Sequence, residues 1–186
     1  MGWYQPKPET SLSLISRLRL SSDAAIIDVG GGDSFLSDHL LNLGFGDLSV
    51  LDISGAALGR AKARLGIRSG EVHWLESDIL EFEPVRSYAL WHDRATFHFL
   101  TEPSQIDNYV NNAIRAIQPE GYLILGTFSE KGPSTCSGLP VQRYSISELQ
   151  EVWSPNFEWV YGLNLDHITP SGSVQAYSFG LFQGRD

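Results

Sequence analysis

The sequence is poor in cysteine, in long apolar runs and in basic residues, and each shortage narrows the possible functions. Cys136 is the single cysteine among 186 residues, which excludes an internal disulfide framework and fits the reducing cytoplasm, where we expect the protein. No apolar run approaches the roughly 20 residues that a membrane-spanning helix needs. The 22 acidic residues outnumber the 13 basic ones, giving a net charge of -9, and such a surface repels nucleic-acid phosphates. We therefore expect no membrane or nucleic-acid partner and favour a small-molecule substrate.

The histidines also lack the spacing of a metal site. The five are His39, His73, His92, His98 and His167. No pair has the close His-x-x-x-His spacing that zinc sites use, and Cys136 has no second cysteine to complete a thiolate site. We expect no metal centre.

One stretch of the chain combines an apolar run, an acid, three glycines and a polar pair. Ala25 to Val29 is typical of a buried strand and carries Asp28, and Gly30, Gly31 and Gly32 follow it. Glycines adopt positive φ and let a ligand approach the backbone closely. A strand, a glycine turn and a helix start, in this order, are typical of α/β proteins that bind an adenosine-bearing cofactor.

The same alternation of strands and helices continues along the chain. Apolar runs predict strands over 25–29, 48–51, 72–75, 88–91 and 122–127, and periodicity predicts helices over 12–20, 35–43, 54–65, 106–117 and 147–153. This order predicts a doubly wound parallel α/β sheet. Two aromatic runs, 157–163 and 174–182, predict an antiparallel hairpin that completes the sheet at one edge. We expect one domain over 1–186, with a flexible arm at 1–9 and a lid-like loop at 129–140.

Acidic residues follow three of the predicted strands. Asp28 precedes the glycine turn, Asp52 ends the second strand and Asp78 follows the third. Ligands of open α/β sheets bind at the carboxyl ends of the strands, so acids there share one crevice. Asp52 could also cap the helix that follows it, and Glu76 or Glu81 could take the place of Asp78.

The glycine turn departs from the dinucleotide-binding fingerprint. Gly30 and Gly32 occupy the first two positions of Gly-x-Gly-x-x-Gly, but Phe35 occupies the third. Asp28 would place a carboxylate beside a pyrophosphate, whereas a cofactor with a cationic amino-acid end tolerates or uses one. We therefore favour S-adenosylmethionine over NAD.

These motifs resemble those of the class I S-adenosylmethionine-dependent methyltransferases over nearly the whole chain. Residues 28–32 are similar to their Asp/Glu-x-Gly-x-Gly motif, with Ser34 where many members have a further glycine. Residues 119–122 resemble their Pro-Gly-Gly turn, with Glu120 in place of one glycine. The resemblance implies a Rossmann-like, three-layer αβα fold with a mostly parallel seven-stranded sheet and S-adenosylmethionine as cofactor.

The resemblance also implies how the cofactor is held. Asp28, Gly30, Gly31 and Gly32 form the turn around its amino-acid end. Asp52, followed by Ile53, grips the two ribose hydroxyls. Asp78 accepts a hydrogen bond from the adenine amino group, with Ile79 beside the ring.

Three segments resemble one bacterial subgroup of small methyltransferases more closely. They are 91–100 (WHDRATFHFL), 136–140 (CSGLP) and 167–170 (HITP) with Gly172. Related enzymes carry an N-terminal helix before a Ser-Trp-Tyr-Gln element, whereas the Trp-Tyr-Gln of this chain begins almost at once. We expect part of the active-site cover to be missing.

Asp93, Arg94 and His98 are the candidate catalytic residues, because the end of the fourth strand faces the transferred methyl group in this fold. His98 follows Arg94 by one helical turn. A nitrogen or oxygen nucleophile needs a base, for which His98 or Asp93 is the candidate, whereas a thiolate or selenolate needs only placement. The simpler alternative is an Asp-Arg ion pair beside a structural histidine. Cys136, in the lid-like loop, is either a reactive thiol or a small packed residue.

These observations predict methyl transfer from S-adenosylmethionine to a small-molecule nucleophile, in which the enzyme aligns the reactants and excludes water. A protein lysine methyltransferase is the nearest alternative, because an acidic enzyme attracts a basic peptide. A non-catalytic cofactor-binding module is a second alternative, and an NAD-dependent oxidoreductase is a third.

Overall fold

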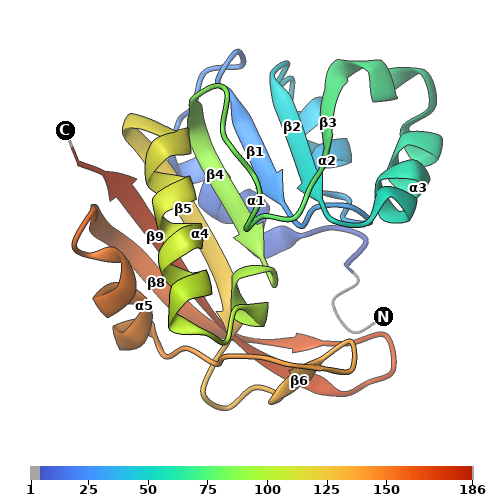
Figure 1. The fold of residues 1–186 in the computed structure, drawn as a ribbon. Coiled ribbons are helices and arrows are strands. Elements are labelled where there is room, and N and C mark those ends of the chain that lie inside the picture. The colour runs from blue at the N-terminus through green and yellow to red at the C-terminus, as the bar shows by residue number, and fades with distance from the viewer. Residues whose placement is uncertain (1–4, 186) are drawn as a thin grey trace.

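The structure, a computed structural model, describes residues 5–185. Its centre is a seven-stranded sheet in the order β3-β2-β1-β4-β5-β9-β8 (Figure 1). The strands are β1 (Ile26–Val29), β2 (Leu48–Asp52), β3 (Val72–Glu76), β4 (Tyr88–Arg94), β5 (Ile117–Phe128), β8 (Phe157–Ile168) and β9 (Val174–Gly184). β1 to β5 are parallel, and β9 pairs antiparallel with β5 and with β8. The predicted doubly wound, mostly parallel sheet with a C-terminal antiparallel hairpin is confirmed.

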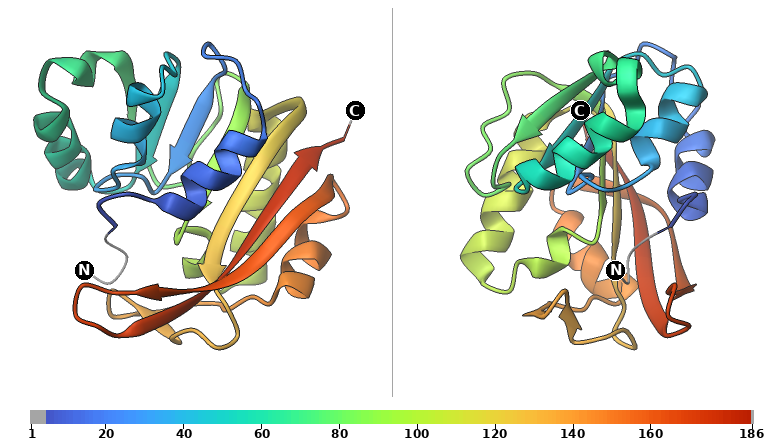
Figure 2. Two further views of the ribbon diagram at one scale, coloured as in Figure 1. Left: turned by 180° about the vertical axis from the view of Figure 1, so that it is seen from behind. Right: turned by 90° about the vertical axis from the view of Figure 1, so that its right-hand side faces the viewer.

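Helices cover both faces of this sheet and give the three αβα layers (Figures 1 and 2). One face carries α1 (Glu9–Arg17), α2 (Leu36–Asn42) and α3 (Gly55–Leu65), and the other carries α4 (Pro103–Ala116) and α5 (Ile146–Trp153). Short 3-10 helices, η1 (Gly66–Glu71) and η2 (Phe97–Phe99), complete the connections. Each face has its own apolar core, because strands buried on both sides need cover on both sides.

Capping residues set several helix boundaries, close to the predicted ranges. Ser54 Oγ accepts a hydrogen bond from the Ala57 backbone N–H at 3.3 Å and so begins α3. Gly66, with φ of 59°, ends α3, and Gly44, with φ of 90°, follows α2. The first helix differs from its predicted range of 12–20. It begins at Glu9, directly after Pro8, and ends at Arg17.

The fourth strand runs further than its apolar residues predict, to Arg94 instead of Trp91. It continues because it has a partner on each side: Asp93 pairs with Val29 of β1 and with Leu125 of β5. Hydrogen bonding along two neighbours thus carries polar residues into the sheet. This extension positions Asp93 and Arg94 on a strand instead of a loop, whereas His98 lies in η2.

The C-terminal hairpin is also longer than predicted, with β8 and β9 paired out to Ile168 and Val174. Within the expected lid-like loop, β6 (Thr135–Cys136) and β7 (Leu139–Pro140) form a two-stranded sheet of their own. Figure 1 shows β6 and the end of the long hairpin below the carboxyl ends of β1, β2 and β4. The carboxyl edge of the parallel strands is therefore bordered by these two hairpins. Trp3 and Tyr4 of the expected arm lie outside the described residues.

Candidate functional site

A cavity of about 860 Å³ opens at the carboxyl edge of the parallel strands. Asp28 of β1, Asp52 of β2 and Asp78, which follows β3, all line it. The cavity is within the range of about 300–1,000 Å³ that small-molecule sites usually span. The structure thus brings together the three acids that the sequence places after successive strands. Glu76 and Glu81, the alternatives to Asp78, are not among its lining residues.

Asp28 is buried, and only one of its two carboxylate oxygens has a hydrogen-bond partner among the described residues. Its Oδ1 lies 2.7 Å from His92 Nδ1, and His92 Nε2 lies 2.8 Å from the Ser11 hydroxyl of α1. All three residues are at most 4 % exposed. Asp28 Oδ2 is buried without a hydrogen-bond partner among the described residues. A buried carboxylate oxygen without a donor is costly, so this atom fits a cationic or hydrogen-bonding group of a bound ligand.

The glycine turn leaves no room for side chains. Gly30 has a φ of 70°, and a Cβ built there would overlap the Thr96 hydroxyl. A Cβ on Gly31 would collide with the Asp28 carboxylate, and one on Gly32 would lie 2.6 Å from Asp52 Oδ2. Gly30 and Gly31 line the cavity, whereas Gly32 contributes its backbone N–H, which donates to Asp52 Oδ2 at 2.9 Å. The turn therefore presents a backbone without side chains next to the carboxylates of Asp28 and Asp52.

Asp52 and Ile53 form the next part of the wall. Asp52 Oδ1 accepts a hydrogen bond from the Ser54 backbone N–H at 2.8 Å, so the carboxylate is fixed from two sides before any ligand binds. The helix-capping side chain itself belongs to Ser54, which leaves Asp52 facing the cavity. Ile53 is 69 % exposed although it is apolar. An exposed isoleucine on a cavity wall fits a flat apolar ligand group that covers it.

Asp78 and Ile79 close the far end of this wall. Asp78 Oδ1 accepts a hydrogen bond from the Leu80 backbone N–H at 2.9 Å, which holds the carboxyl group against its own turn. Ile79 lines the cavity from a largely buried position. Its carbonyl accepts a hydrogen bond from the Asn112 side chain of α4, which anchors this turn to the helix.

The three candidate catalytic residues do not lie together. Arg94 lines the cavity, together with His92 on the same strand, whereas Asp93 and His98 are fully buried behind the wall. Neighbouring residues of a strand point to opposite faces, so His92 and Arg94 share one face and Asp93 faces the core beneath α4. The structure therefore separates Arg94 from the two residues expected to act as a base.

Asp93 holds the turn that follows β4. Its two oxygens accept hydrogen bonds from the backbone N–H groups of Thr96 at 2.8 Å and Phe97 at 2.9 Å, and Tyr109 donates to Oδ2 at 2.5 Å. Burial raises the pKa of Asp93 to about 6. Burial also lowers the pKa of His98 to about 3, so that imidazole is neutral. Both placements favour structural roles for these two side chains, but Asp93 is held by the Thr96 and Phe97 backbone and by Tyr109 instead of by the Asp-Arg ion pair that the sequence suggested.

The β6–β7 hairpin contributes a further part of the cavity lining. Cys136, Ser137, Leu139 and Pro140 line the cavity from this segment. Burial raises the pKa of the Cys136 thiol, which keeps it protonated and weakly nucleophilic. The placement favours the packed-residue interpretation of Cys136.

Two residues of the site, Ser11 and His92, were not predicted from the sequence. Ser11 shares a helix face with Leu14 and Ile15, and all three are buried. A polar residue on the apolar face of an amphipathic helix is the signal that could have found it. His92 had no comparable signal, because a strand that is buried on both faces shows no alternation of polarity.

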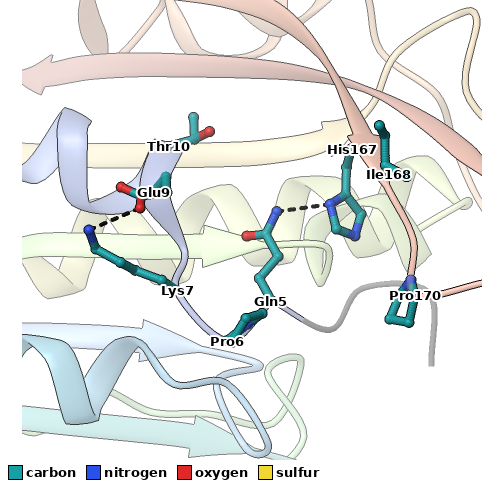
Figure 3. A pocket seen from close by; sticks show the side chains of 8 residues that line it. All are labelled: Gln5, Pro6, Lys7, Glu9, Thr10, His167, Ile168 and Pro170. Atoms are coloured by element: carbon teal, nitrogen blue, oxygen red, sulfur yellow. Dashed lines mark hydrogen bonds and ion pairs between the residues drawn. The ribbon is translucent and has the colours of Figure 1, made fainter. Parts of the chain in front are cut away.

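A second, smaller hollow of about 310 Å³ lies between the N-terminal segment and the tip of the long hairpin (Figure 3). Figure 3 shows Gln5 pointing toward His167, whose Nδ1 lies 3.0 Å from Gln5 Nε2. Lys7 and Glu9 form an exposed ion pair at 2.9 Å on the opposite side. None of the predicted cofactor or catalytic residues lines this hollow. His167 thus lies at this second hollow and not at the large cavity.

Residues 5–185 show neither a metal-binding cluster nor a membrane-spanning helix. No group of three or more His, Cys, Asp or Glu side chains in this range is arranged to hold a metal ion. None of its helices combines the length and the apolar character that crossing a bilayer requires.

Comparison with known sequences identifies relatives of the segment that builds the cavity. Residues 26–121, more than half of the chain, match the methyltransferase domain family. A malonyl-[acyl-carrier protein] O-methyltransferase of Anoxybacillus flavithermus is 31 % identical over 108 residues, which are 57 % of this chain and 39 % of that protein. The matched part of the chain thus spans about two fifths of the length of this relative.

Solved structures share the whole fold. The N-methyltransferase NodS of Bradyrhizobium japonicum superposes with a TM-score of 0.74 at 20 % identity, covering 96 % of both chains. A Burkholderia thailandensis 1,6-didemethyltoxoflavin-N1-methyltransferase, bound to its substrate and S-adenosylhomocysteine, gives 0.76 at 17 % identity and covers 96 % of this chain and 78 % of that one. The chain thus has the fold of these solved methyltransferases, and residues 26–121 match the family in sequence. The chain belongs to the methyltransferase domain family.

Proposed function

We propose that the protein transfers a methyl group from S-adenosylmethionine to a small-molecule nucleophile. The observation that carries this proposal is the unpartnered Asp28 Oδ2, which lies in one cavity with Asp52 and Asp78. A cationic amino group, a ribose and an adenine are the three groups that these carboxylates suit. The family match supports the same cofactor class.

The residues of this cavity fit that cofactor in three places. Asp28, braced by His92, would accept from its ammonium group, and the bare backbone of Gly30, Gly31 and Gly32 would lie along its amino-acid end. Asp52 would bind the ribose hydroxyls. Ile53 and Ile79 would cover the adenine, with Asp78 at its amino group. When bound, the cofactor supplies an activated methyl group on a sulfonium.

The protein's own part is to position the reactants and exclude water. Asp93 fixes the turn after β4 through two backbone N–H groups, and so positions Arg94 and Thr96 without touching the cavity. We propose that Asp93 and His98 act in this way and that neither removes a proton from the acceptor. Thr96 donates to the Val29 carbonyl at 3.3 Å and closes the turn against Gly30.

The finer assignments are proposals as well. We propose membership of the small bacterial subgroup that carries the segment from Trp91 to Leu100, one domain over the chain, and a lid role for 129–140. The position of Cys136, Ser137, Leu139 and Pro140 on the cavity supports the lid. The single cysteine supports a cytoplasmic location.

The test is incubation with methyl-labelled S-adenosylmethionine and cell extract, followed by separation of proteins from small molecules. We expect label in the small-molecule fraction, lost in Asp52→Ala and retained in Asp107→Ala, which removes an exposed carboxylate of α4. Label in protein would support the lysine methyltransferase alternative. Cofactor binding without any labelled product would support the non-catalytic module.

A further inference from the structure

Three buried residues form one chain of contacts that ends at the cavity. The Ser11 hydroxyl lies 2.8 Å from His92 Nε2, and His92 Nδ1 lies 2.7 Å from Asp28 Oδ1. Asp28 and His92 line the cavity, whereas Ser11 belongs to α1 and is not among the lining residues. The contacts therefore join a helix outside the cavity to the carboxylate that the proposed function assigns to the cofactor's ammonium group.

The second oxygen of Asp28 has a fixed position. Asp28 Oδ2 has no hydrogen-bond partner among the described residues, and it is the atom nearest to a Cβ built on Gly31. It thus lies against the glycine turn, where Gly31 lines the cavity. Because the two oxygens of a carboxylate rotate together, the contact that holds Oδ1 also sets the position of Oδ2. His92 is the side chain that makes this contact.

His92 can fix that carboxylate only if its own ring is fixed. An ionised carboxylate accepts hydrogen bonds and cannot donate, so His92 Nδ1 carries the hydrogen of the contact with Asp28. His92 Nε2 then accepts from the Ser11 hydroxyl when the imidazole is neutral, and donates to it when the imidazole is charged. With both nitrogens bonded, the ring cannot turn without breaking two buried hydrogen bonds.

The position of Ser11 on its helix indicates that the hydroxyl serves this contact. Ser11 is 1 % exposed and shares the buried face of α1 with Leu14 and Ile15, which belong to one of the two apolar cores. Alanine is a better helix former and would bury no polar atom at such a position. A buried hydroxyl is costly unless it is hydrogen-bonded, and His92 supplies its partner. Leucine and isoleucine thus dock the helix, and the serine holds the imidazole.

We propose that Ser11 is a positioning residue for the cofactor. Through His92 it holds Asp28 Oδ2 toward the ammonium group, so that α1 contributes to the affinity for this one group. Arg94 also interacts electrostatically with Asp28, but that interaction involves no residue of α1 and remains in a Ser11 variant. The inference rests on the proposed function and deepens it by adding a residue outside the cavity that controls recognition of the ammonium group.

The test is calorimetric titration with three ligands. They are S-adenosylhomocysteine, its deaminated analogue, which keeps the carboxylate but lacks the amino group, and methylthioadenosine, which lacks the whole amino-acid end. Ser11→Ala should weaken S-adenosylhomocysteine by about three- to tenfold, the usual effect of one lost hydrogen bond, and should leave the other two affinities unchanged. Ser13→Ala, at an exposed position of the same helix, is the matched control and should bind all three ligands like the wild type.

A double-variant cycle tests whether Ser11 acts through His92. In a His92→Phe background, Ser11→Ala should cause no further loss of S-adenosylhomocysteine affinity, because the hydroxyl then has no ring nitrogen to hold. Binding of methylthioadenosine reports that each variant is folded.

Three results would overturn this proposal while leaving the proposed function intact. In the first, Ser11→Ala binds S-adenosylhomocysteine as tightly as the wild type. In the second, it weakens the deaminated analogue or methylthioadenosine by the same factor as S-adenosylhomocysteine, so that the ammonium group is not what Ser11 serves. In the third, the losses in Ser11→Ala and His92→Phe add. Failure of the wild-type protein to bind S-adenosylhomocysteine would instead refute the cofactor assignment itself.

Discussion

Removal of the His92 imidazole should destabilise the protein strongly, because Asp28 would lose its side-chain partner. Asp28 and His92 are 4 % and 2 % exposed, and their closest atoms lie 2.7 Å apart. Asp28 Oδ2 already lacks a partner among the described residues, so His92→Leu leaves a buried carboxylate without side-chain hydrogen bonds. Breaking one side of a buried pair costs about 3–5 kcal/mol. For a chain of this size, that loss lowers the melting temperature by about 10 °C.

The assay is urea unfolding followed by circular dichroism, with thermal unfolding in parallel. His73→Leu is the matched control, since His73 is exposed on β3 and should change the unfolding free energy by less than about 0.5 kcal/mol. Adding Asp28→Asn to His92→Leu should restore part of the loss, because a neutral amide costs less to bury than a carboxylate. A loss below about 1 kcal/mol in His92→Leu, or strict additivity in the double variant, would refute the buried pair.

Three further changes probe stability elsewhere. Gly59→Ala, in the open interior of α3, should raise the unfolding free energy by about 0.5–1 kcal/mol, and no gain in the urea midpoint would contradict this. Burial raises the pKa of Asp93 from 3.8 to about 6, so the folded state binds a proton more readily than the unfolded state. The wild type should therefore lose stability relative to Asp93→Asn as the pH rises from about 4 to about 6. Burial lowers the pKa of His98 from 6.5 to about 3, so the wild type should lose stability relative to His98→Gln as the pH falls from about 6.5 to about 4. Unfolding titrations across these ranges check both signs, and a difference independent of pH would contradict either one.

The fold and the convergence of the three acids on the cavity follow from rules that act locally or through topology. Ser54 and Gly66 set the ends of α3 through capping geometry. Asp28, Asp52 and Asp78 converge because parallel strands end at one edge, so their order along the chain is enough to bring them together. Neither result needs side-chain packing to be known.

Which residue at the end of β4 faces the cavity could not be predicted in the same way. Asp93 and Arg94 are adjacent in sequence, yet they point to opposite faces of the sheet, and which one enters the cavity depends on the register with β1 and β5. A strand buried on both faces gives no alternation of polarity from which to infer that choice. The pairing of Ser11 with His92 depends on how α1 docks, which joins residues far apart in the chain.

Calorimetric titration with S-adenosylhomocysteine tests the central claim most directly. We expect one molecule to bind per chain, with affinity at least about tenfold lower in Asp52→Ala, which removes a carboxylate that two backbone N–H groups hold at the cavity. Asp107→Ala, the exposed-carboxylate control, should bind like the wild type. Absence of binding, or equal affinity in Asp52→Ala and the wild type, would contradict the assignment of this cavity to the cofactor.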